Sequence, residues 1–231
     1  MTSSVYRLPE KTSEKELLDL LDFLNKDDEI DGYIVQLPLP KHIDETKVTQ
    51  AIMPSKDVDG FTPYNIGLMQ LGLPCFLPAT PFGIVELLKR SGVETEGKHV
   101  VVLGRSNIVG TPVSVMLSRK GKGGDATVTL CHSKTKNLAE ITRRADIIIV
   151  AIGKPLFLKA DMVKEGAVVI DVGIHRIADE SAEKGYVIQG DVDYDEVYKV
   201  ASKITPVPGG VGPMTIVSLL YNTLQAAKRK R

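Results

Sequence analysis

Residues 99–112 combine the features of a phosphate-binding turn. They read HVVVLGRSNIVGTP: a β-branched run, then Gly104, then a turn that leads to Pro112. A strand that passes through a glycine turn into a helix N-terminus offers unpaired backbone N–H groups and the positive end of the helix dipole to an anion. Ser106 stands where the fingerprint G-x-G-x-x-G has its second glycine, so a plain β-α turn is the alternative interpretation.

The next strand ends in residues that favour a phosphorylated cofactor. NAD-specific sites usually carry an acid about 20 residues on, which accepts from the ribose 2′-OH. Here the segment Cys131-His-Ser-Lys134 contains no acid. Arg105, Ser133 and Lys134 would surround the 2′ position, where positive charge and a hydroxyl suit a 2′-phosphate. We therefore predict NADP, with ordinary loop roles for Ser133 and Lys134 as the alternative.

Three further motifs predict a second ligand. Gln36 ends the strand-like run Gly32–Leu37, at the edge where α/β sheets place ligands. Residues 56–60, KDVDG, put two carboxylates in a turn, and we predict that one of them accepts a fork of two N–H donors. A metal pair is the alternative, although no His or third acid lies at ligand spacing. Residues 207–215, VPGGVGPMT, form a rigid loop that can approach a flat ligand closely.

The first half of the chain must position the second ligand. The pattern predicts a strand at Ser4–Leu8, a helix at Glu14–Asn25 and a strand at Gly32–Leu37. This β-α-β order implies parallel strands. Residues 44–53 are expected to form a short helix, and residues 54–79 a proline-containing loop region.

From residue 80 onwards strands and helices alternate. Thr80 is the expected N-cap of a helix over Pro81–Ser91. Continuous β-branched runs indicate strands that helices cover on both faces. The predicted fold class is therefore α/β, with a Rossmann-like, doubly wound parallel sheet. The strands are expected at His99–Leu103, Ala126–Cys131, Ile147–Ile152 and Ala167–Val172, and the helices at Pro112–Arg119, Asn137–Arg144 and Met214–Ala227.

Composition excludes several classes of protein. Of the 231 residues, 43% are hydrophobic and 25% are charged, which is ordinary globular usage. No apolar run reaches the ~18–20 residues that span a bilayer, and the N-terminal residues lack the pattern of a signal peptide. Two cysteines cannot build a disulfide framework. We expect a reduced, cytoplasmic protein.

Charge is balanced overall but uneven along the chain. The 29 basic and 29 acidic residues give zero net charge, which argues against nucleic acid or a membrane surface as partner. Residues 1–60 hold 13 acids and 7 bases, whereas residues 89–144 hold 11 bases and 4 acids. We expect the basic segment to receive a phosphate-bearing ligand, with chance clustering on solvated faces as the alternative.

Eight ordered motifs resemble those of one enzyme family. They are VQLPLP (35–40), PSKDVDGF (54–61), PATPFG (78–83), GRSNIVGTP (104–112), ATVTLCHSKT (126–135), GAVVIDVGI (166–174), GDVDY (190–194) and ITPVPGGVGPMT (204–215). Together they are similar to the bifunctional methylenetetrahydrofolate dehydrogenase/methenyltetrahydrofolate cyclohydrolase family. The resemblance implies oxidation of 5,10-methylenetetrahydrofolate, usually with NADP, and hydrolysis of the methenyl product to 10-formyltetrahydrofolate.

The resemblance also implies residue roles. Gln36 would lie in the catalytic cleft, and Asp59 would bind the amino edge of the pterin. The cofactor would contact Gly104, Arg105, Ser106, Ser133 and Ile174, with Thr80 and Thr215 on the nicotinamide side. The substrate would contact Val35, Leu37, Pro208, Gly209, Gly212 and Pro213. No metal is implied.

Two domains with a cleft between them follow from the same resemblance. We expect residues 1–80 and the C-terminal helix 213–231 to form the catalytic, folate-side domain, and residues 81–212 to form the NADP domain. The resemblance further implies a homodimer formed through the cofactor domain. Ala79 stands where the family usually has Cys, which suggests modest repacking.

One departure from the family pattern bears on activity. The family carries a Tyr-x-x-x-Lys helix upstream of the VYRLPE strand, and no such motif precedes Gln36. We therefore expect an N-terminally truncated member with an incomplete folate-side domain, an impaired cyclohydrolase step and exposed apolar surface around Val5, Leu17 and Ile34. A non-catalytic NADP-binding remnant is the alternative. Another nicotinamide dehydrogenase would leave the folate-side motifs unexplained.

Overall fold

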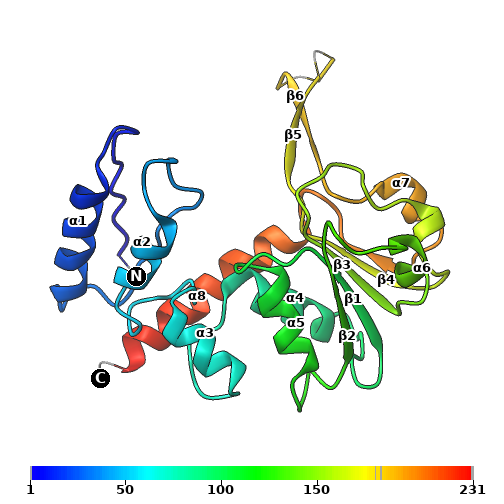
Figure 1. The fold of residues 1–231 in the computed structure, drawn as a ribbon, viewed down its shortest axis with the longest axis horizontal. Coiled ribbons are helices and arrows are strands. Elements are labelled where there is room, and N and C mark those ends of the chain that lie inside the picture. The colour runs from blue at the N-terminus through cyan, green and yellow to red at the C-terminus, as the bar shows by residue number, and fades with distance from the viewer. Residues whose placement is uncertain (1, 180, 183, 230–231) are drawn as a thin grey trace.

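The computed structural model describes residues 2–179, 181–182 and 184–229. It has a larger part built on a parallel sheet and a smaller N-terminal part (Figure 1). Helix α8 (Val211–Arg229) runs from the sheet to the N-terminal part. Met1 and residues 230–231, the ends of the expected folate-side domain, lie outside the described residues.

The larger part contains a five-stranded sheet of order β2-β1-β3-β4-β7, and every pairing is parallel. The predicted α/β class and doubly wound sheet are confirmed. The order reverses beside β1, because the chain adds β2 on one side and then crosses to β3 on the other; ligands of α/β sheets bind at such a point. The strands are β1 (His99–Leu103), β2 (Thr127–Cys131), β3 (Ile147–Val150), β4 (Val168–Asp171) and β7 (Lys203–Ile204).

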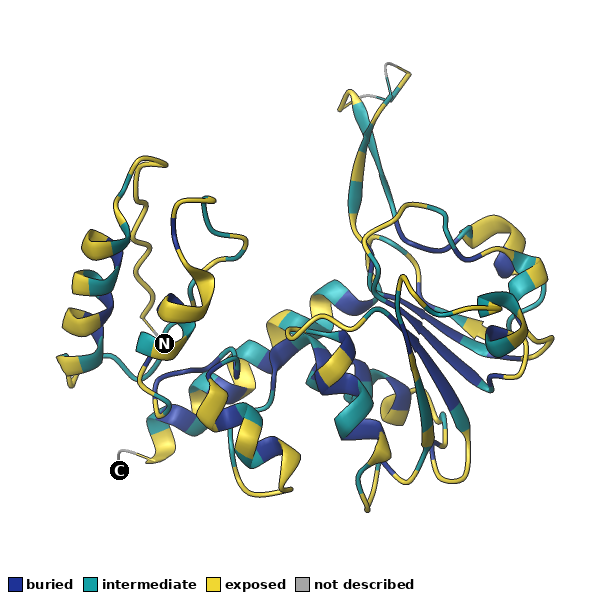
Figure 2. Cartoon of the chain, viewed as in Figure 1, coloured by how far each residue is buried: buried dark blue, intermediate teal, exposed yellow. Residues whose placement is uncertain are grey.

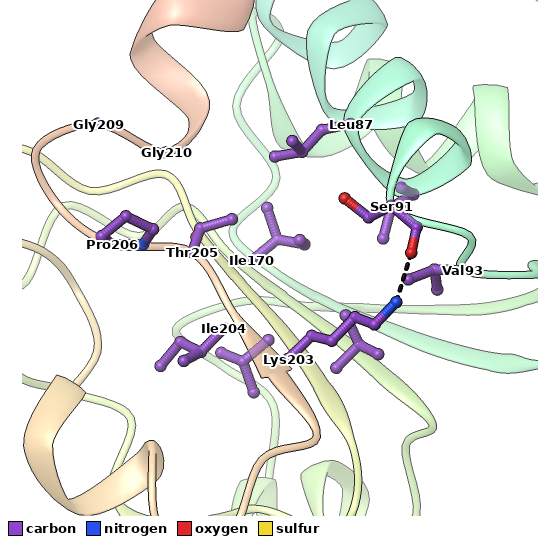
Figure 3. A pocket seen from close by; sticks show the side chains of 13 residues that line it. Leu87, Ser91, Val93, Ile170, Lys203, Ile204, Thr205, Pro206, Gly209 and Gly210 are labelled. Atoms are coloured by element: carbon purple, nitrogen blue, oxygen red, sulfur yellow. Dashed lines mark hydrogen bonds between the residues drawn. The ribbon is translucent and has the colours of Figure 1, made fainter.

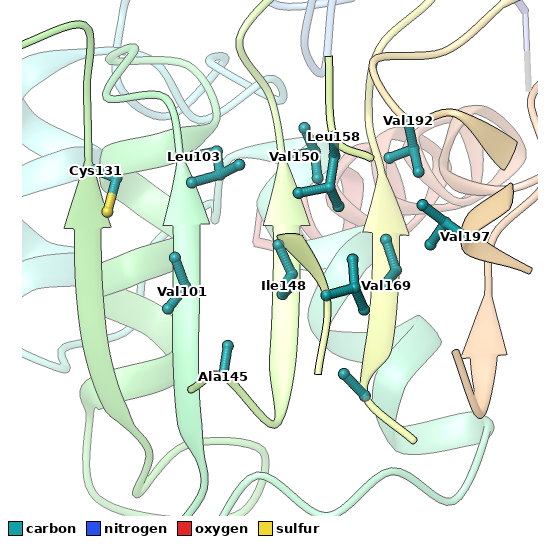
Figure 4. Packing of buried hydrophobic residues seen from close by; sticks show 12 residues of the cluster. Val101, Leu103, Cys131, Ala145, Ile148, Val150, Leu158, Val169, Val192 and Val197 are labelled. Atoms are coloured by element: carbon teal, nitrogen blue, oxygen red, sulfur yellow. The ribbon is translucent and has the colours of Figure 1, made fainter. Parts of the chain in front are cut away.

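Helices cover both faces of the sheet, which explains its continuous apolar strands. Val101 and Leu103 point to the face of α6 (Leu138–Thr142), the short helix η1 (Ala160–Met162) and α7 (Tyr194–Val197) (Figure 4). Val100 and Val102 point to the face of α4 (Ala79–Arg90) and α5 (Gly110–Ser118). All four side chains are buried, so this strand contributes to two cores.

The smaller part has a hydrophobic core, which lies between α1 (Glu14–Lys26) and α2 (Glu45–Ala51). Ser13 begins α1 with a capping box, in which its hydroxyl accepts from the Glu16 N–H and the Glu16 carboxylate accepts from the Ser13 N–H. The expectation that Leu17 is exposed is wrong, because α1 packs its apolar stripe on α2 and leaves Leu17 only 6% exposed. Val5 and Ile34 are 78% and 46% exposed, as predicted.

The predicted β-α-β unit does not form. Residues 4–8 have no strand conformation, and in 32–37 the only pairing is a single bridge between Tyr33 and Asp57. A strand requires a neighbouring ladder, and no described segment runs beside either run for more than that bridge. Gln36 therefore lies on an irregular segment and not at the end of a strand.

One helix was not predicted, and another begins earlier than predicted. The expected loop 54–79 contains α3 (Pro63–Gln70), because Thr62 caps the helix through its hydroxyl and Pro63 suits the first helical position. Helix α4 begins at Ala79 with Pro78 as its N-cap, so Thr80 lies inside the helix and does not cap it.

A two-stranded hairpin was not predicted. Strands β5 (His175–Ala178) and β6 (Tyr186–Gln189) are antiparallel and project away from the main sheet (Figure 1). Figure 2 shows mainly half-buried and exposed residues along the hairpin, against the buried strands of the main sheet. No described helix is both long and apolar enough to cross a membrane.

Candidate functional site

Gly104 allows the ends of two neighbouring strands to approach each other. It follows β1 with a φ of +109°, and a Cβ built on it would lie 2.1 Å from the Ala151 carbonyl oxygen. Only glycine fits such a position without displacing the chain that follows β3. The nucleotide-type turn therefore begins at the point where the strand order reverses.

The turn after Gly104 presents free donors to solvent. The Ser106 hydroxyl accepts from the backbone N–H groups of Val109 and Gly110, at 3.1 and 3.3 Å, and so shapes the start of α5. Within the described chain, the backbone N–H groups of residues 106–108 donate to no acceptor, and these residues are exposed. Free N–H groups beside the N-terminus of a nine-residue helix fit the pyrophosphate of a dinucleotide.

Exposed polar groups surround the ends of β1 and β2. These strands are parallel neighbours, and Leu103 stands opposite Cys131 at their carboxyl ends. Arg105 follows β1, and Ser133 and Lys134 lie on the turn after β2; all three are exposed. The structure thus brings together the residues predicted to hold a 2′-phosphate, and no acid lies between Cys131 and Lys134.

A buried carboxylate organises the segment after β3. The Asp191 oxygens accept from three consecutive backbone N–H groups, those of residues 152–154, at 2.8–3.0 Å. They also contact His175 Nε2 at 2.7 Å, and the Asp191 side chain is fully buried. Asp191 therefore shapes one side of the switch point, the place beside β1 where the strand order reverses. Through His175 it also anchors the base of hairpin β5–β6. The sequence analysis picked out the motif GDVDY but not this role of Asp191. The role could not be seen there, because the N–H groups that Asp191 binds are 37–39 residues away in the sequence.

A second buried acid supports the first. The Asp171 carboxylate accepts from the backbone N–H groups of Gly173, Asp191 and Val192. Burial raises the pKa of Asp171 to about 6, against the lowering effect of those hydrogen bonds. The predicted cofactor residue Ile174 comes three residues after Asp171 and is exposed.

In the KDVDG turn the two carboxylates have different surroundings. Asp57 is buried and accepts from the backbone N–H groups of residues 60–62 and from Asn65 Nδ2. It therefore completes its own turn. No described group donates to the Asp59 carboxylate, and burial together with the charge of Asp57 raises the pKa of Asp59 to about 7. Asp59 is thus the carboxylate with free acceptor oxygens.

Asp59 borders a small hollow, which we call the N-terminal hollow. Its lining includes Tyr33, Val35, Leu37, Asp59 and Phe61. The predicted substrate residues Val35 and Leu37 therefore do lie with Asp59. Gln36 is exposed, its Nε2 donates to the Leu37 carbonyl, and it does not line this hollow.

Two polar groups near this hollow are already engaged by the chain. Lys56 is buried, and its Nζ donates to the carbonyls of Leu24 and Asp27 at the end of α1. The Tyr33 hydroxyl donates to Asn25 Oδ1, and burial raises the pKa of Tyr33 to about 12. Neither group was singled out from the sequence.

The predicted nicotinamide-side residues meet where α4 approaches α8. Thr80 Oγ1 lies 3.0 Å from Thr215 Oγ1. A Cβ on Gly83 would stand 2.9 Å from the Met214 carbonyl carbon, so the two helices approach unusually closely there.

Residues 207–215, which we call the Gly/Pro loop, lie at the edge of the sheet, and from Val211 onward they form the start of α8 and not a loop. Gly209, with a φ of +105°, and Gly210 line a cavity of about 210 Å³ together with Leu87, Ile170, Lys203 and Ile204 (Figure 3). No residue of 208–213 lines the N-terminal hollow. Among the described residues, no three His, Cys, Asp or Glu side chains gather in a way that could hold a metal ion.

Comparison with known families and proteins identifies the family to which this chain is similar. Residues 1–59 match the model described as "Tetrahydrofolate dehydrogenase/cyclohydrolase, catalytic domain", and residues 78–231 match its "NAD(P)-binding domain". The bifunctional protein FolD of Flavobacterium johnsoniae is 65% identical over 228 residues, which are 99% of this chain and 77% of that protein.

Solved structures share the fold. The bifunctional enzyme FolD of Campylobacter jejuni is 52% identical, with a TM-score of 0.90 over 98% of this chain and 77% of that one. The Trypanosoma brucei FolD, solved with NADP and an inhibitor, is 43% identical, with a TM-score of 0.90 over 96% of this chain and 75% of that one. The resemblance seen in the motifs is confirmed: the chain belongs to the tetrahydrofolate dehydrogenase/cyclohydrolase family.

Proposed function

We propose that this protein oxidises 5,10-methylenetetrahydrofolate to 5,10-methenyltetrahydrofolate with NADP, and hydrolyses the product to 10-formyltetrahydrofolate. Asp59 gives the main support: its half-buried carboxylate has no donor from the described chain and borders the N-terminal hollow. A pterin presents adjacent N–H donors, which a carboxylate accepts as a pair. Among the described residues no buried side-chain oxygen or nitrogen lacks a partner, so the unpaired Asp59 oxygens are accessible to such a ligand.

The cofactor would bind across the switch point of the sheet. Free N–H groups after Gly104 suit its pyrophosphate, and Arg105 and Ser133 suit a 2′-phosphate. Ser106 shapes this turn. Ile174 would contact the cofactor, and Thr80 and Thr215 would lie on the nicotinamide side. NADP supplies the hydride acceptor, so the task of the protein is to orient the folate methylene carbon against it.

We assign the folate side to residues 1–80 with the helix 213–231, and the cofactor side to residues 81–212. Gln36 and Asp59 are proposed as the residues at the reacting substrate. The substrate walls are assigned to the segment beside Gln36 and to the Gly/Pro loop, through Val35, Leu37, Pro208, Gly209, Gly212 and Pro213.

Hydrolysis is proposed to be the weaker of the two activities. Activation of water requires a proton-transfer group, which is typically worth 10²–10⁴-fold. The titratable residues that line the N-terminal hollow are Tyr33, Asp57 and Asp59. Lys56 is directed to the end of α1, and Asp57 is engaged by its own turn. Asp59, whose pKa burial raises to about 7, is left as the group there that can exchange a proton near neutral pH.

Separate assays of the two steps test this function. NADPH formation from 5,10-methylenetetrahydrofolate is followed with NADP and with NAD, and hydrolysis of methenyltetrahydrofolate is followed without cofactor. We expect NADPH formation, preference for NADP, and hydrolysis slower than oxidation. Tight NADP binding with no NADPH formation would identify a non-catalytic remnant and overturn the proposal.

We further propose a cytoplasmic homodimer joined through the cofactor side. Cys75 and Cys131 are both free thiols, which suits a reducing compartment. Hairpin β5–β6 and the short edge strand β7 leave backbone edges that a second copy can cover. Sedimentation analysis should give twice the chain mass of 25.1 kDa, and a strictly monomeric species would contradict the dimer.

A further inference from the structure

Asn222 lies on the buried face of α8 and is 3% exposed. Its Nδ2 donates to the backbone carbonyls of Val58, at 2.8 Å, and Leu77, at 2.9 Å. Carbonyl oxygens only accept, so the amide nitrogen must face them, and both of its hydrogens are used. One side chain therefore joins three segments that are far apart in the sequence.

The two carbonyls belong to segments that carry the proposed site. One directly precedes Asp59, and the other lies two residues before α4, whose first turn carries Thr80. These segments also touch each other. The Ala79 N–H donates to the Asp59 carbonyl at 3.2 Å, and a Cβ on Gly60 would stand 2.6 Å from the carbonyl carbon of Leu77.

Helix α8 holds the start of α4 at a second point. Thr215 lies seven residues before Asn222, close to two helical turns, and it contacts Thr80. Asp57, in contrast, shapes the turn from within through the N–H groups of residues 60–62. Asp57 thus sets the form of the turn, whereas Asn222 sets where the turn sits relative to α4 and α8.

We propose that Asn222 is a positioning residue for the oxidation step. It fixes the separation between the Asp59 carboxylate, which binds the pterin edge, and the nicotinamide side at Thr80 and Thr215. The inference rests on the proposed function. Asn222 acts only through the two carbonyls that it holds. Misplacement by about 1 Å can reduce an orientation-dependent reaction about 10²-fold.

The test replaces the amide and measures binding separately from turnover. Asn222→Leu keeps a similar size without donors, and Asn222→Ser keeps one donor. Thr223→Val is the matched control, since the Thr223 hydroxyl donates only to the Leu219 carbonyl within α8. Calorimetry gives Kd for tetrahydrofolate and for NADP, and steady-state assays give KM and kcat, all well below the unfolding temperature.

We expect Asn222→Leu to raise the tetrahydrofolate Kd at least tenfold and to lower kcat/KM about 10²-fold, with the NADP Kd unchanged. The tetrahydrofolate Kd and the kcat/KM of Asn222→Ser should lie between those of Asn222→Leu and the wild type. Both values for Thr223→Val should equal those of the wild type. If the Leu variant does not fold, the Ser variant carries the same comparison.

Two results would overturn the role of Asn222. One is a folded variant with the wild-type tetrahydrofolate Kd. The other is a parallel loss of NADP affinity, since that reports general destabilisation. If the wild type binds both ligands but forms no NADPH, the proposed function fails, while the Kd comparison still decides the role of Asn222.

Discussion

Thr80 Oγ1 of α4 contacts Thr215 Oγ1 of α8 at 3.0 Å, 135 residues apart in the sequence. This contact joins a helix that begins beside the Asp59 turn to a helix that begins beside the sheet. Both hydroxyls are half-buried. The residues proposed for the nicotinamide side thus lie where these two helices meet.

The close approach of α4 to α8 depends on Gly83. In Gly83→Ala the new Cβ would meet the Met214 backbone at 2.9–3.0 Å. We expect a loss of about 1–3 kcal/mol in the free energy of unfolding, because the helices must move apart. Denaturant unfolding measures this loss.

Gly67→Ala is the matched control for Gly83. Gly67 lies in α3, and its Cβ would have no neighbour within 4 Å. Alanine there should stabilise the helix by about 0.5–1 kcal/mol. Equal effects of the two substitutions would contradict the close helix contact.

Folate affinity should depend on the ionisation of Asp59. Burial and the charge of Asp57 raise the pKa of Asp59 to about 7, and only the carboxylate form accepts two N–H groups. Affinity for tetrahydrofolate should therefore rise as the pH increases through 7 and fall as the pH decreases below it. Calorimetric Kd values between pH 6 and 8 measure this dependence.

Asp59→Asn separates this effect from titration of the ligand. We expect the variant to bind tetrahydrofolate more weakly and without the step near pH 7. A step of equal size in the variant would show that another group controls affinity.

Stability should also depend on Asp59, in the opposite direction. Its pKa in the folded protein lies above the ordinary value of 3.8, so the folded state binds more protons than the unfolded state between these two values. Stability contributed by this group therefore falls as pH rises from about 4 to 7. Asp59→Asn should raise the unfolding temperature at pH 8 relative to the wild type. A lower unfolding temperature of the variant at pH 8 would contradict a half-buried, unpaired Asp59 carboxylate.

The conformation of the segment after β3, residues 152–154, should depend on Asp191. Asp191→Ala removes four hydrogen bonds, three of them to consecutive backbone N–H groups. These donors are part-buried, and the Asp191 carboxylate that holds them is fully buried. Loss of a hydrogen bond to a charged group costs about 1.5–3 kcal/mol, so we expect a loss of about 3 kcal/mol in total and weaker NADP binding. Thermal unfolding and NADP calorimetry measure both.

Asp193→Ala provides the comparison for Asp191. The Asp193 carboxylate forms an ion pair with Lys159 at 2.9 Å, and both side chains are partly exposed. Its loss should cost less than about 1 kcal/mol. If Asp191→Ala were as mild as Asp193→Ala, Asp191 would not organise the switch point.

The sheet was predictable because its pattern is local. The continuous apolar runs Val100–Leu103 and Ile147–Val150 indicate strands that are covered on both faces. Gly104 indicates the turn between strand and helix. The N-terminal part was not, because residues 4–8 have a strand-like pattern but find no partner ladder. Pro63 indicated a loop, although after Thr62 it starts a helix.

The site was predictable where the residues of one short motif determine its conformation by contacts among themselves. The phosphate turn and the KDVDG turn are of this kind, although only the structure distinguishes Asp57, which holds its turn, from Asp59, which has free oxygens. Asn222 and Asp191 act through contacts with residues distant in the chain. No spacing within their own segments signals such contacts.

NADPH formation from 5,10-methylenetetrahydrofolate, measured side by side for the wild type and for Asp59→Asn, tests the proposed activity and the role of Asp59 together. Both proteins should bind NADP equally, because Asp59 lies outside the cofactor turn. We expect NADPH formation by the wild type and a loss of at least about tenfold in kcat/KM in the variant. Equal rates, or no NADPH from a wild type that binds NADP, would contradict it.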